Sequence, residues 1–206
     1  MLINSLLAFA FSLSLNASAS PFAFEEGAHC VAYQVEKVLF FIKTQTVVGK
    51  NCDVSAQVLP ELGGLYRIEV NIPIRSFRSG DSERDKDVMR ILMAEERPEL
   101  TFRSKSLSSE GWRDLFAKKG FSLDGELTIG QNSFPLKLDV SYTDSDGKAE
   151  VDGEAKVKFT HFNLKPPTIA GGIIVKAKPD LELYFRLQSQ RILGADSIRL
   201  GRKNVK

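Results

Sequence analysis

The chain contains only two cysteines, two histidines and one tryptophan among its 206 residues. So few cysteines exclude a disulfide-rich miniature scaffold. The 28 basic and 26 acidic residues leave a net charge of +2, so the basic excess of most nucleic-acid-binding domains is absent and we expect no nucleic-acid partner. Hydrophobic residues at 43% and charged residues at 26% argue against a disordered chain and are typical of a soluble globular protein. The length suits one domain.

Signals of catalysis are equally scarce. The sequence has no G-x-S-x-G of a serine hydrolase, no phosphate-binding loop and no C-x-x-C that would suit zinc. Residues 144–147 resemble the start of a calcium loop, but Ala155 stands at the twelfth position, where a glutamate is required. We therefore expect a protein that is not an enzyme and requires no metal or cofactor. An enzyme that uses His161 at a barrel mouth is the alternative.

The first 19 residues are typical of a signal peptide. They carry no charged side chain, and an apolar run is followed by Ala17 and Ala19, the small residues that a signal peptidase accepts. The run is shorter than the roughly 20 residues needed to span a bilayer. We predict cleavage after Ala19 and export to the periplasm or the medium, with an uncleaved anchor as the alternative.

Export changes the interpretation of Cys30 and Cys52. In an oxidising compartment, two cysteines without competitors are most simply a pair. A disulfide between them would close a loop whose restriction stabilises the fold by roughly 3 kcal/mol. We predict a structural disulfide, and two buried free thiols are the alternative.

Alternation of apolar and polar residues dominates the rest of the chain and predicts half-buried strands. Between Ala149 and Phe159, for example, apolar residues and Gly153 alternate with charged residues, which occupy every second position from Glu150 to Lys158. The predicted strands, about eight in all, lie at residues 38–42, 54–58, 66–74, 100–104, 121–129, 134–142, 149–159 and 181–187. Turn residues at 130–133 and 144–147 indicate antiparallel neighbours.

Three other segments lack this alternation. Residues 82–93 repeat with the period of an amphipathic helix, whose start Ser79 or Asp81 can cap and which Pro98 stops before the next strand. Residues 161–178 contain paired prolines and paired glycines and are predicted to be a loop. Residues 194–206 are basic and without period, so we expect a disordered tail with, at most, transient contact with a membrane surface.

About eight antiparallel strands with one apolar face each must hide those faces together, in a sandwich or a closed barrel. An eight-stranded barrel has an interior wide enough for side chains or for one small ligand. The pattern therefore predicts an all-β, lipocalin-like barrel with one short helix in a crossover. An outer-membrane barrel, with the faces reversed, would need aromatic girdles that four tyrosines and one tryptophan do not supply.

A combination of blocks resembles the YceI-like family. Glu83-Arg84-Asp85 opens the predicted helix, residues 98–104 run from Pro98 to Ser104, and residues 125–130 read Gly-Glu-Leu-Thr-Ile-Gly. The resemblance spans residues 33–187 and implies an exported lipocalin-like barrel that binds polyisoprenoids, with an isoprenoid lipid or quinone as ligand. In place of the family's Arg-x-Asp-Phe-Gly run, this chain has residues 159–163, in which Asn163 can adopt the positive φ of the glycine.

The resemblance and the alternation together predict the parts of the molecule and its site. The domains are a signal peptide at 1–19, a lipid-binding barrel at 20–193 and the tail at 194–206. Arg84 and Asp85 form either a rim contact or a structural ion pair. The expected lumen-lining residues are Phe40, Ile42, Ile68, Val70, Ile72, Phe102, Leu123, Leu127, Leu136, Leu138, Val157, Phe159, Leu183 and Phe185. A barrel filled by its own side chains and acting as an interaction module is the alternative function.

Overall fold

The computed structural model describes residues 22–40, 43–145, 147–169, 175–198 and 200, so the predicted signal peptide lies outside the described residues. One sheet of 13 strands makes up most of the molecule, which confirms the all-β class with more strands than the eight expected. The strands are β1 (Cys30–Leu39), β2 (Lys43–Asn51), β3 (Ser55–Glu61), β4 (Leu65–Pro73), β5 (Glu99–Ser104), β6 (Leu107–Ser108), β7 (Gly120–Ile129), β8 (Asn132–Ser145), β9 (Lys148–Lys158), β10 (Thr168–Ile169), β11 (Val175–Ala177), β12 (Asp180–Gln188) and β13 (Ile192–Leu193).

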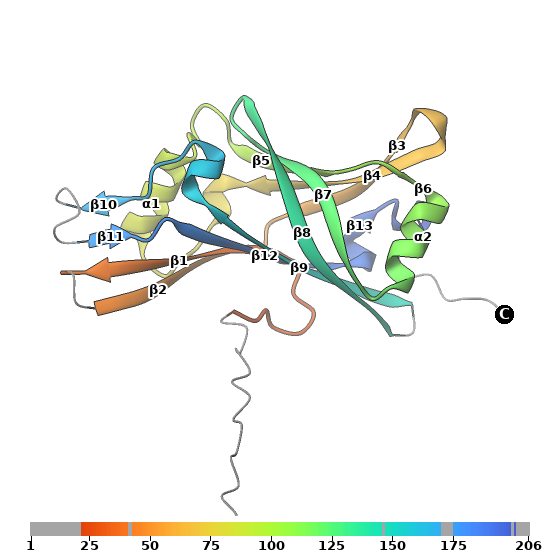
Figure 1. Cartoon of the computed structure of the whole chain (residues 1–206), viewed down its shortest axis with the longest axis horizontal. Coiled ribbons are helices and arrows are strands. Elements are labelled where there is room, and N and C mark those ends of the chain that lie inside the picture. Colours follow the sequence, from red (N-terminus) through yellow and green to blue (C-terminus); the bar gives the residue numbers. More distant parts are fainter. Residues whose placement is uncertain (1–21, 41–42, 146, 170–174, 199, 201–206) are drawn as a thin grey trace, which may run out of the picture.

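The sheet curls around a common interior (Figure 1). Its order is β10-β11-β1-β12-β9-β8-β7-β5-β4-β3-β13, while β2 also pairs with β1 and β6 with β4. Every pair is antiparallel except β13 with β3. At one point β2 pairs with the segment that follows β4: the backbones of Lys50 and Arg78 exchange hydrogen bonds of 2.9 and 2.8 Å. This bridge connects β2 to the segment before the first helix and stabilises the curled shape of the sheet.

Alternation decides which residues face the interior. Along β8, Phe134, Leu136, Leu138 and Val140 are buried while the residues between them are exposed. Tight turns join the neighbours as predicted: Gly147 has φ of 80°, and its amide donates a 3.0 Å hydrogen bond to Asp144 Oδ1. The inward side chains form one continuous core.

Two α-helices lie at opposite ends of the curled sheet (Figure 1). The predicted helix is α1 (Ser82–Ile91); the carboxylate of Asp81 caps it and none of its residues is buried. The second helix, α2 (Ser109–Ala117), was not expected. It buries Trp112 and Phe116, and the indole of Trp112 donates a 2.9 Å hydrogen bond to the Tyr66 carbonyl. The α2 end of the interior is therefore sealed, whereas the α1 end is only covered.

Two segments expected to be irregular contain structure. The region 161–178 includes β10 and β11, because both pair with strands of the main sheet. The tail begins later than residue 194: Ala195–Ile198 form a 3-10 turn, and Ile198 and Leu200 are buried. Residues 199 and 201–206 lie outside the described residues. These two short regions have too few residues to show a period, so tertiary pairing alone reveals them.

The predicted disulfide between Cys30 and Cys52 is present. It joins the start of β1 to the residue after β2, so it fixes the ends of these paired strands. Among the described residues there is no helix both long enough and apolar enough to cross a bilayer.

His29 precedes β1 and gives the fold a predictable dependence on pH. The side chain is 1% exposed, and its Nδ1 accepts a 3.1 Å hydrogen bond from the Gln188 amide. Burial, with a further contribution from the positive charge of Arg191, lowers the pKa of His29 to about 4. Since the unfolded chain protonates this histidine near pH 6.5, the unfolded state binds more protons between pH 6.5 and 4.

We expect the free energy of unfolding to fall by up to about 3 kcal/mol as the pH drops through this window. Urea denaturation at a series of pH values measures it. The variant His29→Asn keeps a hydrogen-bond acceptor but cannot titrate, so its stability should vary less between pH 6.5 and 4. Equal pH dependence of both proteins would contradict the assignment.

Candidate functional site

An apolar hollow lies beneath α1. This outer hollow has a volume of about 320 Å³ and is bounded by α1 on one side and by β1, β2 and β12 on the other. The helix contributes the half-buried side chains of Val88, Ile91 and Leu92, and the strands contribute Val35 and Val47, among others. Its volume lies within the range of small-molecule sites.

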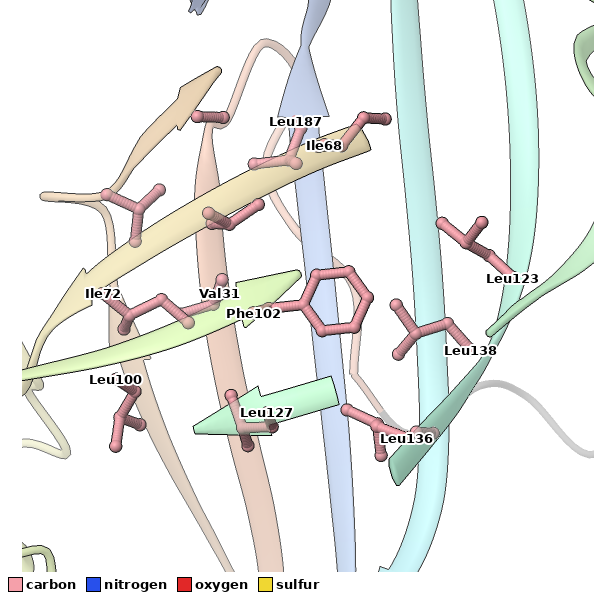
Figure 2. Packing of buried hydrophobic residues seen from close by; sticks show 14 of the residues in the cluster. Val31, Ile68, Ile72, Leu100, Phe102, Leu123, Leu127, Leu136, Leu138 and Leu187 are labelled. Carbon is pink, nitrogen blue, oxygen red and sulfur yellow. The ribbon is translucent and has the colours of Figure 1, made fainter. Parts of the chain in front are cut away.

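A second, inner hollow of about 130 Å³ lies deeper in the barrel. Its walls come from β4, β5, β7, β8 and β12, and Figure 2 shows the ring of Phe102 pointing across this interior toward Leu136 and Leu138. An apolar hollow of this size stays dry and accepts apolar guests. The two hollows share wall residues, so they adjoin. The shared residues are Tyr33, Phe77, Leu100, Leu127 and Leu183.

Glycines opposite aromatic rings keep this space free. Gly49 pairs with Tyr33 and Gly153 pairs with Phe185 across neighbouring strands. At each of these glycines, a Cβ would overlap the ring of its partner. Without a side chain at Gly49 and Gly153, the rings lie against the wall of the barrel instead of projecting into its centre.

The structure places most of the residues predicted to line the lumen beside one of the two hollows. The inner hollow is lined by Ile68, Val70, Ile72, Phe102, Leu123, Leu127, Leu136, Leu138, Leu183 and Phe185, and the outer hollow also by Phe159. Val157 packs against the core without lining either hollow. The prediction is wrong for Phe40, which lies in the β1–β2 turn and is 63% exposed, and Ile42 lies outside the described residues.

The prediction missed Val35, Val47 and Phe77, which line the outer hollow. The exposed residues at the start of β2 hide its alternation, because both faces of residues 43–46 meet solvent. A signal was available in Gly49, an unusual residue for a strand that often marks close approach of a neighbour.

Charged side chains surround the mouth of the outer hollow. Arg84 pairs with Asp81 at 3.1 Å, not with Asp85. Asp85 instead accepts hydrogen bonds from the amide and hydroxyl of Ser79 at 2.9 and 2.5 Å. Both residues thus fix the start of α1, and Arg84 also lines the hollow, as does Lys37.

Tyr33 places one polar atom inside this apolar space. Its buried hydroxyl has no hydrogen-bond partner of good geometry among the described residues. Burial, together with the charge of Asp85, raises the pKa of Tyr33 to about 12, so the hydroxyl stays protonated and can donate. A ligand with one acceptor near the mouth would meet a donor there.

The histidines do not form a catalytic arrangement with carboxylates. His161 Nε2 lies 2.6 Å from the Pro135 carbonyl oxygen, and its ring packs edge-on against Phe162. Asn163 has the positive φ, 55°, that was predicted for it. Within the described part of the chain, no cluster of three His, Cys, Asp or Glu residues could hold a metal ion.

Comparison with known proteins agrees with this architecture. The model of the YceI-like domain family matches residues 20–188. BcnA of Burkholderia cenocepacia has a TM-score of 0.55 at 21% sequence identity, covering 76% of this chain and 95% of that one. The YCEI protein of Campylobacter jejuni has a TM-score of 0.52 at 18% identity, covering 88% and 97%. These two structures show that solved proteins share the fold.

A polyisoprenoid binding domain from Saccharophagus degradans has a TM-score of 0.46 at 11% identity, covering 77% of this chain and 92% of that one. No curated protein matches this sequence.

The glycine–ring pairs generate a prediction about the space itself. Gly153→Ala should force the ring of Phe185 into the inner hollow, which lowers the capacity for an apolar guest and costs about 1–3 kcal/mol of stability. Binding of the fluorescent isoprenoid alcohol retinol measures the capacity, and thermal unfolding measures the stability. Gly120→Ala is the matched control, because a Cβ at Gly120 meets no atom within 4 Å. Equal retinol binding by both variants would show that the ring does not define the space.

Proposed function

This chain belongs to the YceI-like family, and we propose that it is a non-catalytic binding protein that holds a polyisoprenoid or similar long apolar lipid in its interior. The observation that carries the proposal is the pair of adjoining apolar hollows, which share Tyr33, Phe77 and Leu183 on their walls. An apolar tail gains roughly 25 cal/mol for each Å² that it removes from water, so it needs no specific polar contact to bind.

The two ends of the barrel differ, and the difference predicts the orientation of the bound ligand. The α2 end is sealed by Trp112 and Phe116, while α1 covers the other end with half-buried side chains. We therefore expect the tail to enter beneath α1 and to point toward α2. A polar head group would then lie near Lys37, Arg84 and the hydroxyl of Tyr33.

We further propose that the protein is exported to the periplasm or the medium after removal of residues 1–19. The disulfide between Cys30 and Cys52 supports an oxidising compartment. An isoprenoid quinone or its precursor is the ligand we favour, and transient contact with a membrane surface would let the protein collect and release it. In this role the protein acts as a carrier or store, and no chemistry is required of it.

The alternative, a filled barrel that serves as an interaction module, has less support. A filled interior would leave no space beyond that of a few waters, whereas the outer hollow alone has about 320 Å³.

Native mass spectrometry of the exported chain tests the proposal. We expect a co-purifying hydrophobic mass, or uptake of retinol at one molecule per chain. Leu183→Trp should abolish uptake, since an indole at this shared wall residue fills the junction of the hollows. The same substitution at Leu193, which is 72% exposed, is the control and should bind as the unchanged chain does. An apo mass that takes up no isoprenoid would refute the function.

A further inference from the structure

The tip of the β1–β2 hairpin carries an unusual residue. Phe40 has φ of 47°, in the left-handed region that glycine and asparagine adopt most easily, and its side chain is 63% exposed. A bulky residue held there costs free energy in the backbone, and its mostly exposed ring gains little free energy from burial. Such a residue is explained most simply by a contact outside the molecule.

Positive charge surrounds this tip. The neighbouring described positions of β1, β2 and β11 contribute Lys37, Lys43 and Lys176, and Lys178 follows β11; the carboxylates of Glu36 and Asp180 lie beside Lys178, further from the tip. Lys178 pairs with Glu36, whereas Lys43 and Lys176 form no ion pair among the described residues. The exposed ring is therefore flanked by free ammonium groups.

The register places these lysines next to the ring. Lys43 pairs across the hairpin with Leu39, the residue before Phe40. Lys176 pairs with Val38 on the other side of β1. An apolar tip between lysines is the pattern of a segment that inserts into the headgroup layer of an anionic bilayer.

The tip also lies on the side of the molecule where the outer hollow opens. The same strand β1 contributes Val35 and Lys37 to that hollow, and β1, β2, β10 and β11 extend together beside α1 at the left of Figure 1. The acidic residues of α1 at this end do not oppose an anionic surface strongly. Asp81, Glu83 and Asp87 are each paired with a basic side chain of α1.

We infer that the exposed ring of Phe40 inserts into an anionic lipid bilayer, with Lys43 and Lys176 against the headgroups, and so docks the mouth of the barrel on that bilayer. This inference rests on the proposed function, because it supplies the route by which a membrane lipid reaches the hollow. A second copy of the chain fits the tip less well, since pairing two such tips would bring lysines together.

Flotation with vesicles that contain phosphatidylethanolamine and phosphatidylglycerol tests the docking. Phe40→Asn should lower the partition coefficient by about ten-fold, because the ring is lost while asparagine still accepts the positive φ. The control is Leu62→Asn, which removes a side chain that is 95% exposed in the β3–β4 turn and should leave partition unchanged. The unchanged chain should bind pure phosphatidylcholine vesicles more weakly by about five-fold per lysine engaged, which is about 25-fold for Lys43 and Lys176 together.

Equal flotation of the unchanged chain and the Phe40→Asn variant would overturn the inference, as would an equal loss in the Leu62→Asn variant. Dimers that dissociate in the Phe40→Asn variant without any change in flotation would identify a second copy as the occupant instead, and would also overturn it.

Retinol added without vesicles separates this inference from the proposed function. Phe40→Asn should bind it as the unchanged chain does, yet should accept it more slowly from vesicles. If no form of the chain binds retinol or any other isoprenoid but the flotation result holds, the lipid-carrier function fails and the docking stands. If retinol binds and flotation does not depend on Phe40, only the docking fails.

Discussion

The seal at one end of the barrel determines what the rest of the interior can do. Trp112 is fully buried at the α2 end and is held there by its hydrogen bond to the Tyr66 carbonyl, so its indole closes this end with close-packed side chains. At the other end, α1 covers the interior with side chains that are only half buried. Apolar walls that are closed at one end and covered at the other form a blind tube, and a long apolar chain is the guest that such a tube favours.

The hollow itself depends on small residues as much as on large ones. Tyr33 and Phe185 would fill the centre of the barrel if each projected inward, but Gly49 and Gly153 let the rings lie on the wall. The space is thus a property of pairs of residues on neighbouring strands. Neither member of a pair reveals it alone.

A feature could be predicted from the sequence where its signal lies within one segment, and was missed where it depends on residues from separate strands. Long alternating strands such as β8 and β9 and the capped helix α1 were predictable, because their periods are visible within one segment. The strand β2 was missed because its first half is exposed on both faces, and α2 because it has only nine residues and includes Gly111, a poor helix former. Phe40 was assigned to the lumen by alternation, but the hairpin turns at that residue and points it outward.

The position of Trp112, the only tryptophan of the chain, allows the direction of the guest to be measured. A bromine atom quenches indole fluorescence only at short range. An isoprenoid brominated at the end of its tail should therefore quench Trp112, and one brominated beside its head group should bind equally well and leave the fluorescence nearly unchanged. Bound ligand that quenches from the head group and not from the tail, or from neither, would contradict entry beneath α1 with the tail toward α2.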